Sequence, residues 1–132
     1  MKDSDCWQTP DWLMKHFKGH YDPCPPKEVR NVLYNGLVAD WESPAYVNPP
    51  YSNPLPWVQK AIAESKKGVD VVLLLRVDVS TKWYRLLMEQ NPHVAFFNER
   101  VKFKGSKGCP NFCSMLVFLE GVLCECERKK EE

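Results

Sequence analysis

The sequence lacks any apolar run that approaches the roughly 20 residues of a membrane-spanning helix. Its first ten residues, MKDSDCWQTP, contain no apolar stretch typical of a secretion signal. Neither sign of charge dominates, because 18 Lys and Arg residues stand against 17 Asp and Glu residues. This balance excludes a polycationic coat for nucleic acid but permits a local basic patch. We therefore expect a cytoplasmic protein; its oligomeric state is not indicated.

Patterns typical of hydrolases and metal sites are also missing. No Ser-His-Asp or paired-carboxylate arrangement is recognisable, and the three histidines have no partner pattern. Of the six cysteines, only the sets Cys109-x-x-x-Cys113 and Cys124-x-Cys126 approach the spacing of metal ligands, and they do not match the usual zinc pattern. In a reducing compartment the cysteines would remain thiols. We expect no metal site.

What is present fits a single globular domain. The chain has 132 residues, of which 44% are hydrophobic and 27% are charged. We expect one domain over residues 1–123, followed by a charged, solvated tail over residues 124–132. Eight of the 11 prolines fall between positions 23 and 56, so that stretch cannot hold a long helix.

Hydrophobic periodicity indicates alternating helices and strands. The apolar run over residues 71–75 does not alternate with polar residues, which is typical of a strand covered on both faces. The first helix is expected to begin with Thr9 as its N-cap, and the third with Ser80 or Thr81. We predict an α/β protein with a compact, Rossmann-like fold, in which helices flank a mostly parallel central sheet. The predicted helices span residues 9–19, 54–68 and 80–92, and the predicted strands span residues 20–22, 37–40, 46–48, 69–77, 94–97 and 114–119.

The sharpest feature is the motif Asn48-Pro49-Pro50-Tyr51, which directly follows a predicted strand and so lies where α/β sheets keep their active sites. The side-chain oxygen of Asn48 and the carbonyl oxygen of Pro49 are two acceptors for the NH2 group of a planar exocyclic amine. Such hydrogen bonds would draw the nitrogen towards a pyramidal shape and free its lone pair for methyl transfer. The two prolines would aim the carbonyl, and Tyr51 would offer a face to a flipped base. A merely stiffened turn is the structural alternative.

Through this motif and several other blocks in one order, the sequence resembles the compact phage DNA N6-adenine methyltransferases, which are Dam-like enzymes dependent on S-adenosylmethionine. The resemblance covers nearly the whole chain and implies a methyltransferase fold. The matching blocks are Trp7-Gln8-Thr9-Pro10, Tyr21-Asp22-Pro23-Cys24, Leu37-Val38-Ala39-Asp40-Trp41, Val47-Asn48-Pro49-Pro50-Tyr51-Ser52, Leu73-Leu74-Leu75 leading to Thr81-Lys82-Trp83, Arg100-x-x-Phe103 and Ser114-Met115-Leu116-Val117-Phe118.

The resemblance also implies a set of residues that bind S-adenosylmethionine. Thr9 and Pro10 resemble the segment at the methionine end of the cofactor, and Asp40 resembles the acid that binds its adenine amine. One departure is that the turn after Asp22 contains no glycine, so the usual ribose ligand is not evident and Glu28 or Asn31 could replace it. The implied cofactor-binding residues are Trp7, Thr9, Pro10, Asp22, Pro23, Asp40 and Trp41.

DNA is the expected partner, and a basic window is the candidate contact with its phosphates. Arg100, Lys102, Lys104 and Lys107 carry four positive charges without an intervening acid. Arg76, at the end of the long apolar strand, would either meet phosphate or pair with Asp78. A solvated hairpin is the structural alternative for the basic window.

Two alternatives to DNA methylation remain open at this point. The same four-residue motif serves methyl transfer to an adenine in RNA or to a glutamine side chain in a protein. A degenerate methyltransferase fold that binds without catalysing is the other alternative, because the turn that usually holds the cofactor has lost its glycines.

Overall fold

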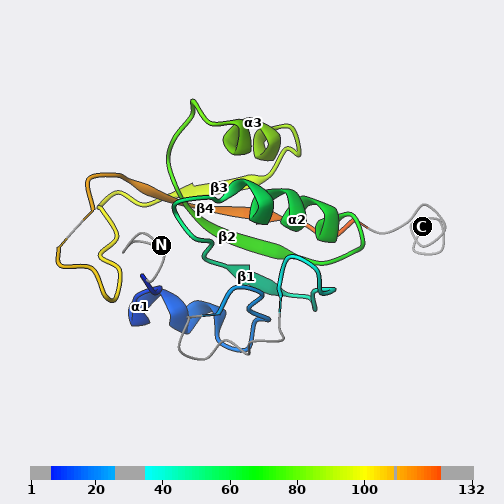
Figure 1. Cartoon of the computed structure of the whole chain (residues 1–132), viewed down its shortest axis with the longest axis horizontal. Coiled ribbons are helices and arrows are strands. Elements are labelled where there is room, and N and C mark those ends of the chain that lie inside the picture. Colours follow the sequence, from blue (N-terminus) through cyan, green and yellow to red (C-terminus); the bar gives the residue numbers. More distant parts are fainter. Residues whose placement is uncertain (1–6, 26–34, 109, 123–132) are drawn as a thin grey trace.

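The protein is described by a computed structural model that covers residues 7–25, 35–108 and 110–122. Within these residues a four-stranded sheet is flanked by helices on both faces (Figure 1). Helices α2 (Leu55–Ser65) and α3 (Lys82–Met88) cover one face, called here the α2 face. Helix α1 (Asp11–Met14) and the short 3-10 helix η2 (Lys15–Phe17) cover the other, called the α1 face. The α/β class is therefore confirmed.

The sheet is mixed, and the prediction of a mostly parallel sheet is wrong. Its strands are β1 (Ala45–Val47), β2 (Val71–Arg76), β3 (His93–Phe96) and β4 (Ser114–Leu119), in the spatial order β1-β2-β4-β3. Only β1 and β2 pair in parallel, because β4 runs antiparallel between β2 and β3. An apolar strand has the same residue pattern in either direction, so the sequence did not reveal the orientation of β4.

Strand β2 is buried on both faces, as its unbroken apolar run predicts. Val71, Leu73 and Leu75 pack on the α2 face, whereas Val72 and Leu74 pack on the α1 face. None of the five is more than 8% exposed. Burying large aliphatic side chains is worth roughly 1.5–3 kcal/mol each. Strand β2 therefore stabilises the centre of the sheet and fixes the position of the residues at its carboxyl end.

The three predicted helices are present, but Thr9 does not cap the first. Pro10 occupies the N-cap position of α1 and makes no side-chain cap. Helix α2 starts after Pro54 and carries Pro56 in its first turn, where the missing N–H costs nothing. Of the two expected N-caps of α3, Thr81 is the one used, since its side chain accepts a hydrogen bond from the Tyr84 N–H at 3.2 Å.

The predicted strand over residues 37–40 is wrong, because this segment is a turn. Asn35 accepts hydrogen bonds from the backbone N–H groups that a strand would use to pair with its neighbour. Its side-chain oxygen accepts from the Leu37 N–H at 3.0 Å, and its carbonyl oxygen accepts from the Ala39 N–H at 3.0 Å. In place of the predicted strand over residues 20–22 there is one parallel bridge between Tyr21 and Ala45, which extends the sheet beyond β1 by a single residue pair.

No helix among the described residues is long and apolar enough to cross a membrane. The predicted charged tail over residues 124–132 lies outside the described residues, as do Glu28 and Asn31.

Candidate active site

The carboxyl ends of β1, β2 and β3 and the start of β4 meet at one edge of the sheet, called here the motif edge. The Asn-Pro-Pro-Tyr motif begins one residue after β1 ends, so its predicted place at a strand's carboxyl end is confirmed. Arg76 ends β2 and lies in register with Ser114, the first residue of β4. The motif therefore shares this edge with the ends of its neighbouring strands.

The Asn48 side chain is held by the hydroxyl group of Thr9, which is itself bonded to the hydroxyl group of Tyr46. Its Nδ2 donates to Thr9 Oγ1 at 3.3 Å. Thr9 Oγ1 in turn lies 2.8 Å from the Tyr46 hydroxyl, in a buried hydrogen bond that links residues 37 positions apart. Burial raises the pKa of the Tyr46 phenol above its ordinary value, and the Asp22 carboxylate adds to this shift, while the Thr9 hydrogen bond opposes it. Tyr46 thus stays neutral and acts only through its hydrogen bond.

Three buried side-chain polar atoms in the described part of the chain lack a hydrogen-bond partner, and all three belong to residues at the motif edge. They are Asn48 Oδ1, Tyr51 Oη and Ser114 Oγ. Buried polar groups are almost always paired, since leaving one unpaired costs about 1–3 kcal/mol. Their concentration at one edge indicates a place where a ligand supplies the missing donors and acceptors. Ser114 was not predicted as a site residue, because a serine at the start of an apolar strand gives no local signal.

The ring of Tyr51 lies in a cluster of four aromatic side chains. It contacts Phe103 edge-on at 5.4 Å between ring centroids, Phe112 at 5.4 Å and Trp7 at 6.2 Å. Trp7 also stacks on Phe103 at 5.7 Å. Burial raises the pKa of the Tyr51 phenol well above its ordinary value, so the group stays protonated. The stacking of a base on Tyr51 stays a prediction; Phe103 and Phe112 become visible as neighbours of the motif only in three dimensions.

Arg76 anchors the motif loop. Its Nη1 donates to the Tyr51 carbonyl at 3.2 Å, and its Nε lies 3.7 Å from Asp78 Oδ2. The guanidinium also lies over the Trp83 ring, 5.3 Å from the ring centroid. Of the two predicted alternatives for Arg76, the structure shows the contact with Asp78, and it adds the bond to Tyr51. With these internal contacts, Arg76 is better placed to hold the loop than to reach a phosphate.

Asp22 and Pro23 lie in the turn that replaces the missing glycine-rich segment. Asp22 Oδ1 accepts a hydrogen bond from the Cys24 N–H at 3.0 Å, which closes the turn. Gly36 lies directly against this turn, because a Cβ at that position would sit 1.9 Å from the Pro23 carbonyl oxygen. A glycine distant in sequence thus permits the close approach. Since Asp22 acts electrostatically on Tyr46, the turn lies near the Asn48 network.

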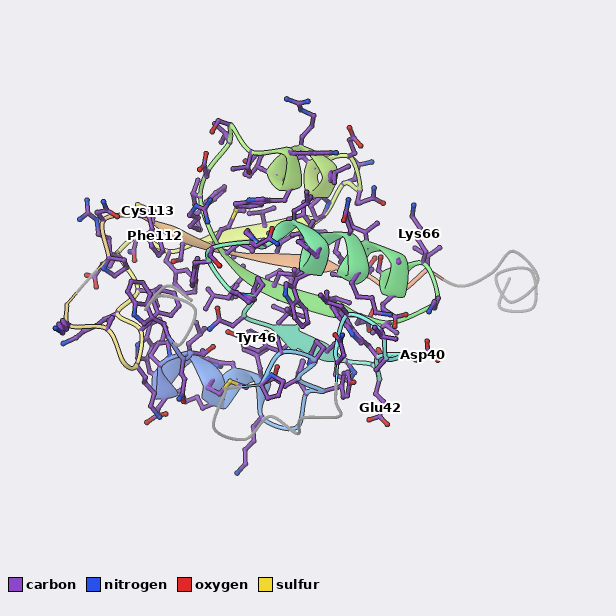
Figure 2. The ribbon with its side chains drawn as sticks, viewed as in Figure 1. Asp40, Glu42, Tyr46, Lys66, Phe112 and Cys113 are labelled. Atoms are coloured by element: carbon purple, nitrogen blue, oxygen red, sulfur yellow. The ribbon has the colours of Figure 1, made fainter. Side chains whose placement is uncertain are left out.

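Asp40 and Trp41 do not reach the motif edge, so the structure does not support their predicted place beside the other cofactor residues. The Asp40 carboxylate is exposed and pairs with Lys67 at 3.2 Å, in the turn that precedes β2. Figure 2 shows Asp40 at the end of the sheet away from Phe112. Only four residues separate Asp40 from β1, so this segment must stay at the strand's amino end.

The Trp41 side chain serves the fold. It is 5% exposed, and its indole N–H donates to the Gly36 carbonyl at 2.7 Å. Its backbone N–H donates to Glu64 at 2.9 Å. Burial disfavours ionisation of Glu64, but hydrogen bonds from Lys67, Trp41 and Lys60 outweigh it and hold the pKa of the carboxyl below its ordinary value. The backbone of Trp41 is therefore part of a structural charge cluster, and its indole is buried in the core rather than a free face for a cofactor ring.

The predicted basic window lies next to the aromatic cluster. Val101 and Phe103 are buried, whereas Lys102 and Lys104 between and after them are exposed, so an extended segment points its cations outward. Lys104 pairs with Asp11 at 3.0 Å. Exposed side chains also include Arg100 and Lys107. Lys102 and Lys104 are therefore the immediate neighbours of Phe103, which touches Tyr51.

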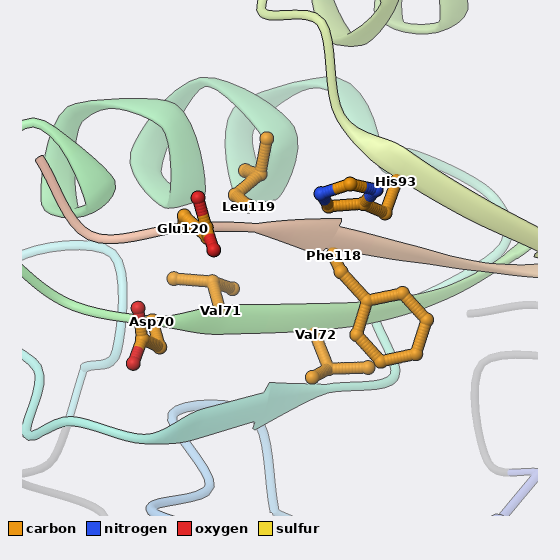
Figure 3. A pocket seen from close by; sticks show the side chains of 7 residues that line it. All are labelled: Asp70, Val71, Val72, His93, Phe118, Leu119 and Glu120. Atoms are coloured by element: carbon orange, nitrogen blue, oxygen red, sulfur yellow. The ribbon is translucent and has the colours of Figure 1, made fainter.

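A hollow of about 360 Å³ lies at the other end of the sheet (Figure 3). Its walls include Asp70 before β2, His93 on β3 and Glu120 after β4. It lies at the amino end of β2 and contains no residue of the motif. We therefore do not assign the reaction to this hollow.

The structure also bears on the expected lack of a metal site. Among residues 7–25, 35–108 and 110–122, no group of three or more His, Cys, Asp or Glu side chains could hold a metal ion. Cys113 is an exposed free thiol. Cys109, Cys124 and Cys126 lie outside the described residues.

Comparison with known proteins identifies the family. Residues 27–126 match the family model for DNA N-6-adenine-methyltransferase (Dam). The chain belongs to this family. It is also 35% identical over 116 residues to the DNA N-6-adenine-methyltransferase of Haemophilus phage HP1 (strain HP1c1), a match that covers 76% of this chain and 67% of the relative. No solved structure matches the chain. The resemblance seen in the sequence is therefore confirmed.

Proposed function

We propose that this chain transfers a methyl group from S-adenosylmethionine to the exocyclic N6 amine of an adenine extruded from DNA. Membership of the DNA N-6-adenine-methyltransferase family supports the reaction type and the DNA substrate. The observation that carries the assignment of the site is the Asn48 carboxamide, which leaves a buried oxygen without a partner next to a proline-locked turn.

The chemistry needs two acceptors for the adenine amine. The lone pair of this nitrogen is delocalised into the ring, so the amine is a poor nucleophile. Hydrogen bonds from its two N–H groups to Asn48 Oδ1 and to the Pro49 carbonyl would favour a pyramidal nitrogen and localise the lone pair. Preorganised acceptors of this kind are worth roughly 3 kcal/mol each, by analogy with oxyanion holes.

Thr9 and Tyr46 decide which atom of the carboxamide is free. With Thr9 Oγ1 accepting from Nδ2, the oxygen of the same amide is left for the substrate. The 2.8 Å bond to Tyr46 fixes the Thr9 hydroxyl, and Tyr46 itself is 2% exposed and packs face to face on Phe17. We therefore assign Thr9 and Tyr46 as positioning residues for Asn48. Because Oδ1 has no contact with solvent, the amine reaches it only after the residues that cover it move locally.

The residues at the motif edge fit a bound methyl donor. S-adenosylmethionine, when bound, supplies a methyl group activated by a sulfonium cation. Asp22 offers a carboxylate for amino or hydroxyl groups, and the aromatic faces of Trp7 and Tyr51 suit a nearby positive charge. Pro10 and Pro23 adjoin these groups in the chain and complete the proposed donor site. Asp40 and Trp41 are left out because they lie at the opposite end of the sheet.

No side-chain base is needed for this reaction. The nitrogen gains the methyl group and a positive charge, and its extra proton passes to water. Asn48 and Pro49 act only as acceptors, and both phenols near them stay protonated because burial raises the pKa of Tyr46 and of Tyr51. Of the predicted basic window, Arg100, Lys102 and Lys107 would contact the phosphates that flank the extruded base, while Lys104 pairs with Asp11.

Nucleoside mass spectrometry tests the proposed function. Purified protein is incubated with methyl-labelled S-adenosylmethionine and, in parallel, with duplex DNA, RNA or a glutamine-containing peptide. We expect label in N6-methyladenine from DNA and background label elsewhere. Label only in RNA or peptide would overturn the proposed substrate. Absence of label from every substrate, together with no calorimetric binding of S-adenosylmethionine, would favour a non-catalytic binding module.

A further inference from the structure

Trp12 and Phe97 form an aromatic pair at the motif edge, in which Trp12 is exposed and Phe97 is half-buried. Trp12 lies on α1 and is 51% exposed, and Phe97 follows the last residue of β3. Their rings meet edge to face, with centroids 5.9 Å apart and an interplanar angle of 81°. Phe97 rests on the buried cluster of the α1 face, so the pair stands on a rigid base.

The pair adjoins the basic window. Asp11, the residue before Trp12, bonds Lys104 at 3.0 Å. The backbones of Gln8 and Lys104 are joined by two hydrogen bonds of 2.9 Å, which tie the segment before α1 to the window. Because Asp11 neutralises Lys104, the cations left for an outside partner are Arg100, Lys102 and Lys107.

The same strip leads directly to the proposed target-base site. Phe103 lies between Lys102 and Lys104 and contacts the Tyr51 ring at 5.4 Å. An exposed π surface, unpaired cations and the catalytic motif therefore follow one another along one edge of the molecule. A nucleic-acid strand presents the matching groups, because every base has a π face and every linkage carries a negative charge.

We propose that the Trp12–Phe97 pair stacks on a DNA base that loses its neighbour when the target adenine is extruded. This inference rests on the proposed function and adds a contact for the bases that are not methylated. Extrusion of one base breaks two stacking contacts in the duplex, and an aromatic side chain that replaces one of them lowers the cost of the open state.

The chain offers a matched control in Phe96. Phe96 is 62% exposed, so it is at least as accessible as Trp12. It lies in register with Met115, a residue of the α2 face, and it therefore points away from the pair. Truncation of Phe96 removes a similar exposed ring next to the same window without touching the proposed surface.

Fluorescence anisotropy with a short labelled duplex tests the proposal, in the presence of S-adenosylmethionine. We expect Trp12→Ala to weaken DNA binding about 10-fold, Trp12→Phe to retain most of the affinity, and Phe96→Ala to match the wild type. Trp12→Leu keeps an apolar contact with Phe97 but has no π face, so it should lose affinity like the alanine variant. Binding to a duplex with a mismatch at the target adenine, whose base opens more easily, should depend on Trp12 at least as strongly, because the contact forms in the open state.

Two results would overturn the proposal. One is equal affinity of Trp12→Ala, Trp12→Leu and wild type for the duplex. The other is a change of sedimentation coefficient in the Trp12 variants with DNA affinity unaltered, which would make the pair an interface between copies of the chain. Either failure is separable from that of the proposed function, because methylation of adenine by the wild-type protein is scored independently of the Trp12 variants.

Discussion

Asn48→Ala is expected to lower kcat/KM for DNA methylation on the order of 10²- to 10³-fold, the loss seen when one preorganised oxyanion-hole group is removed. The alanine cannot accept from the adenine amine, so the nitrogen keeps its delocalised lone pair. Binding of S-adenosylmethionine and the free energy of unfolding should change little, because the loss of the 3.3 Å bond from Nδ2 to Thr9 is offset by removal of a buried oxygen that has no partner. Single-turnover kinetics, calorimetry and urea unfolding measure the three quantities.

Two variants sharpen this prediction. Asn48→Asp keeps oxygen acceptors at the position and should retain more activity than Asn48→Ala. Asn53→Ala removes an exposed carboxamide from the same loop and should match the wild type. Wild-type turnover in Asn48→Ala would contradict the assigned role of the motif.

Thr9→Val is expected to lower kcat on the order of 10- to 100-fold, with smaller changes in the affinity for DNA and for S-adenosylmethionine. Valine fills the same space but accepts no hydrogen bond, so the Asn48 amide loses the group that fixes its orientation. Thr9→Ser restores a hydroxyl and should recover most of the rate. Tyr46→Phe removes the hydroxyl group that is hydrogen-bonded to Thr9, and it should also lower kcat but by a smaller factor.

The effects of Thr9→Val on kcat and on the binding of S-adenosylmethionine distinguish the positioning role of Thr9 from the cofactor contact that the family resemblance implies. A residue at the methionine end of the cofactor would, when changed, raise the dissociation constant of S-adenosylmethionine. If Thr9→Val raises that constant and leaves kcat at saturating cofactor unchanged, Thr9 contacts the donor and does not position Asn48. A serine variant as slow as the valine variant would also contradict the positioning role.

Local signals in the sequence predicted the elements better than their arrangement. The unbroken run of β2 and the Thr81 cap of α3 are decided by neighbours in the chain, and both were predicted correctly. The direction of β4 depends on the path of residues 97–113, which no periodicity reports. The turn at residues 37–40 was mistaken for a strand because its apolar residues resemble one, while Asn35 captures their amides.

In the candidate site too, features decided by neighbours in the chain were predicted, whereas those decided by tertiary contacts were not. The motif was found from its own residues, since two prolines and a flanking amide after an apolar run form a local pattern. Thr9 looked like a helix cap by the same local logic, yet its hydroxyl bonds Tyr46 and Asn48, which are 37 and 39 positions away. Asp40 looked like a strand-end acid, but the short link to β1 keeps it at the wrong end of the sheet. Contacts of this range are fixed by tertiary packing.

A crystal structure with duplex DNA and a non-reactive analogue of S-adenosylmethionine would show whether Asn48 and Pro49 bind the amine of the target adenine. We predict an extruded adenine whose N6 lies about 2.7–3.2 Å from both Asn48 Oδ1 and the Pro49 carbonyl oxygen, with Nδ2 still bonded to Thr9. An adenine amine bound by other groups, with Asn48 Oδ1 still buried and unpartnered, would contradict the account.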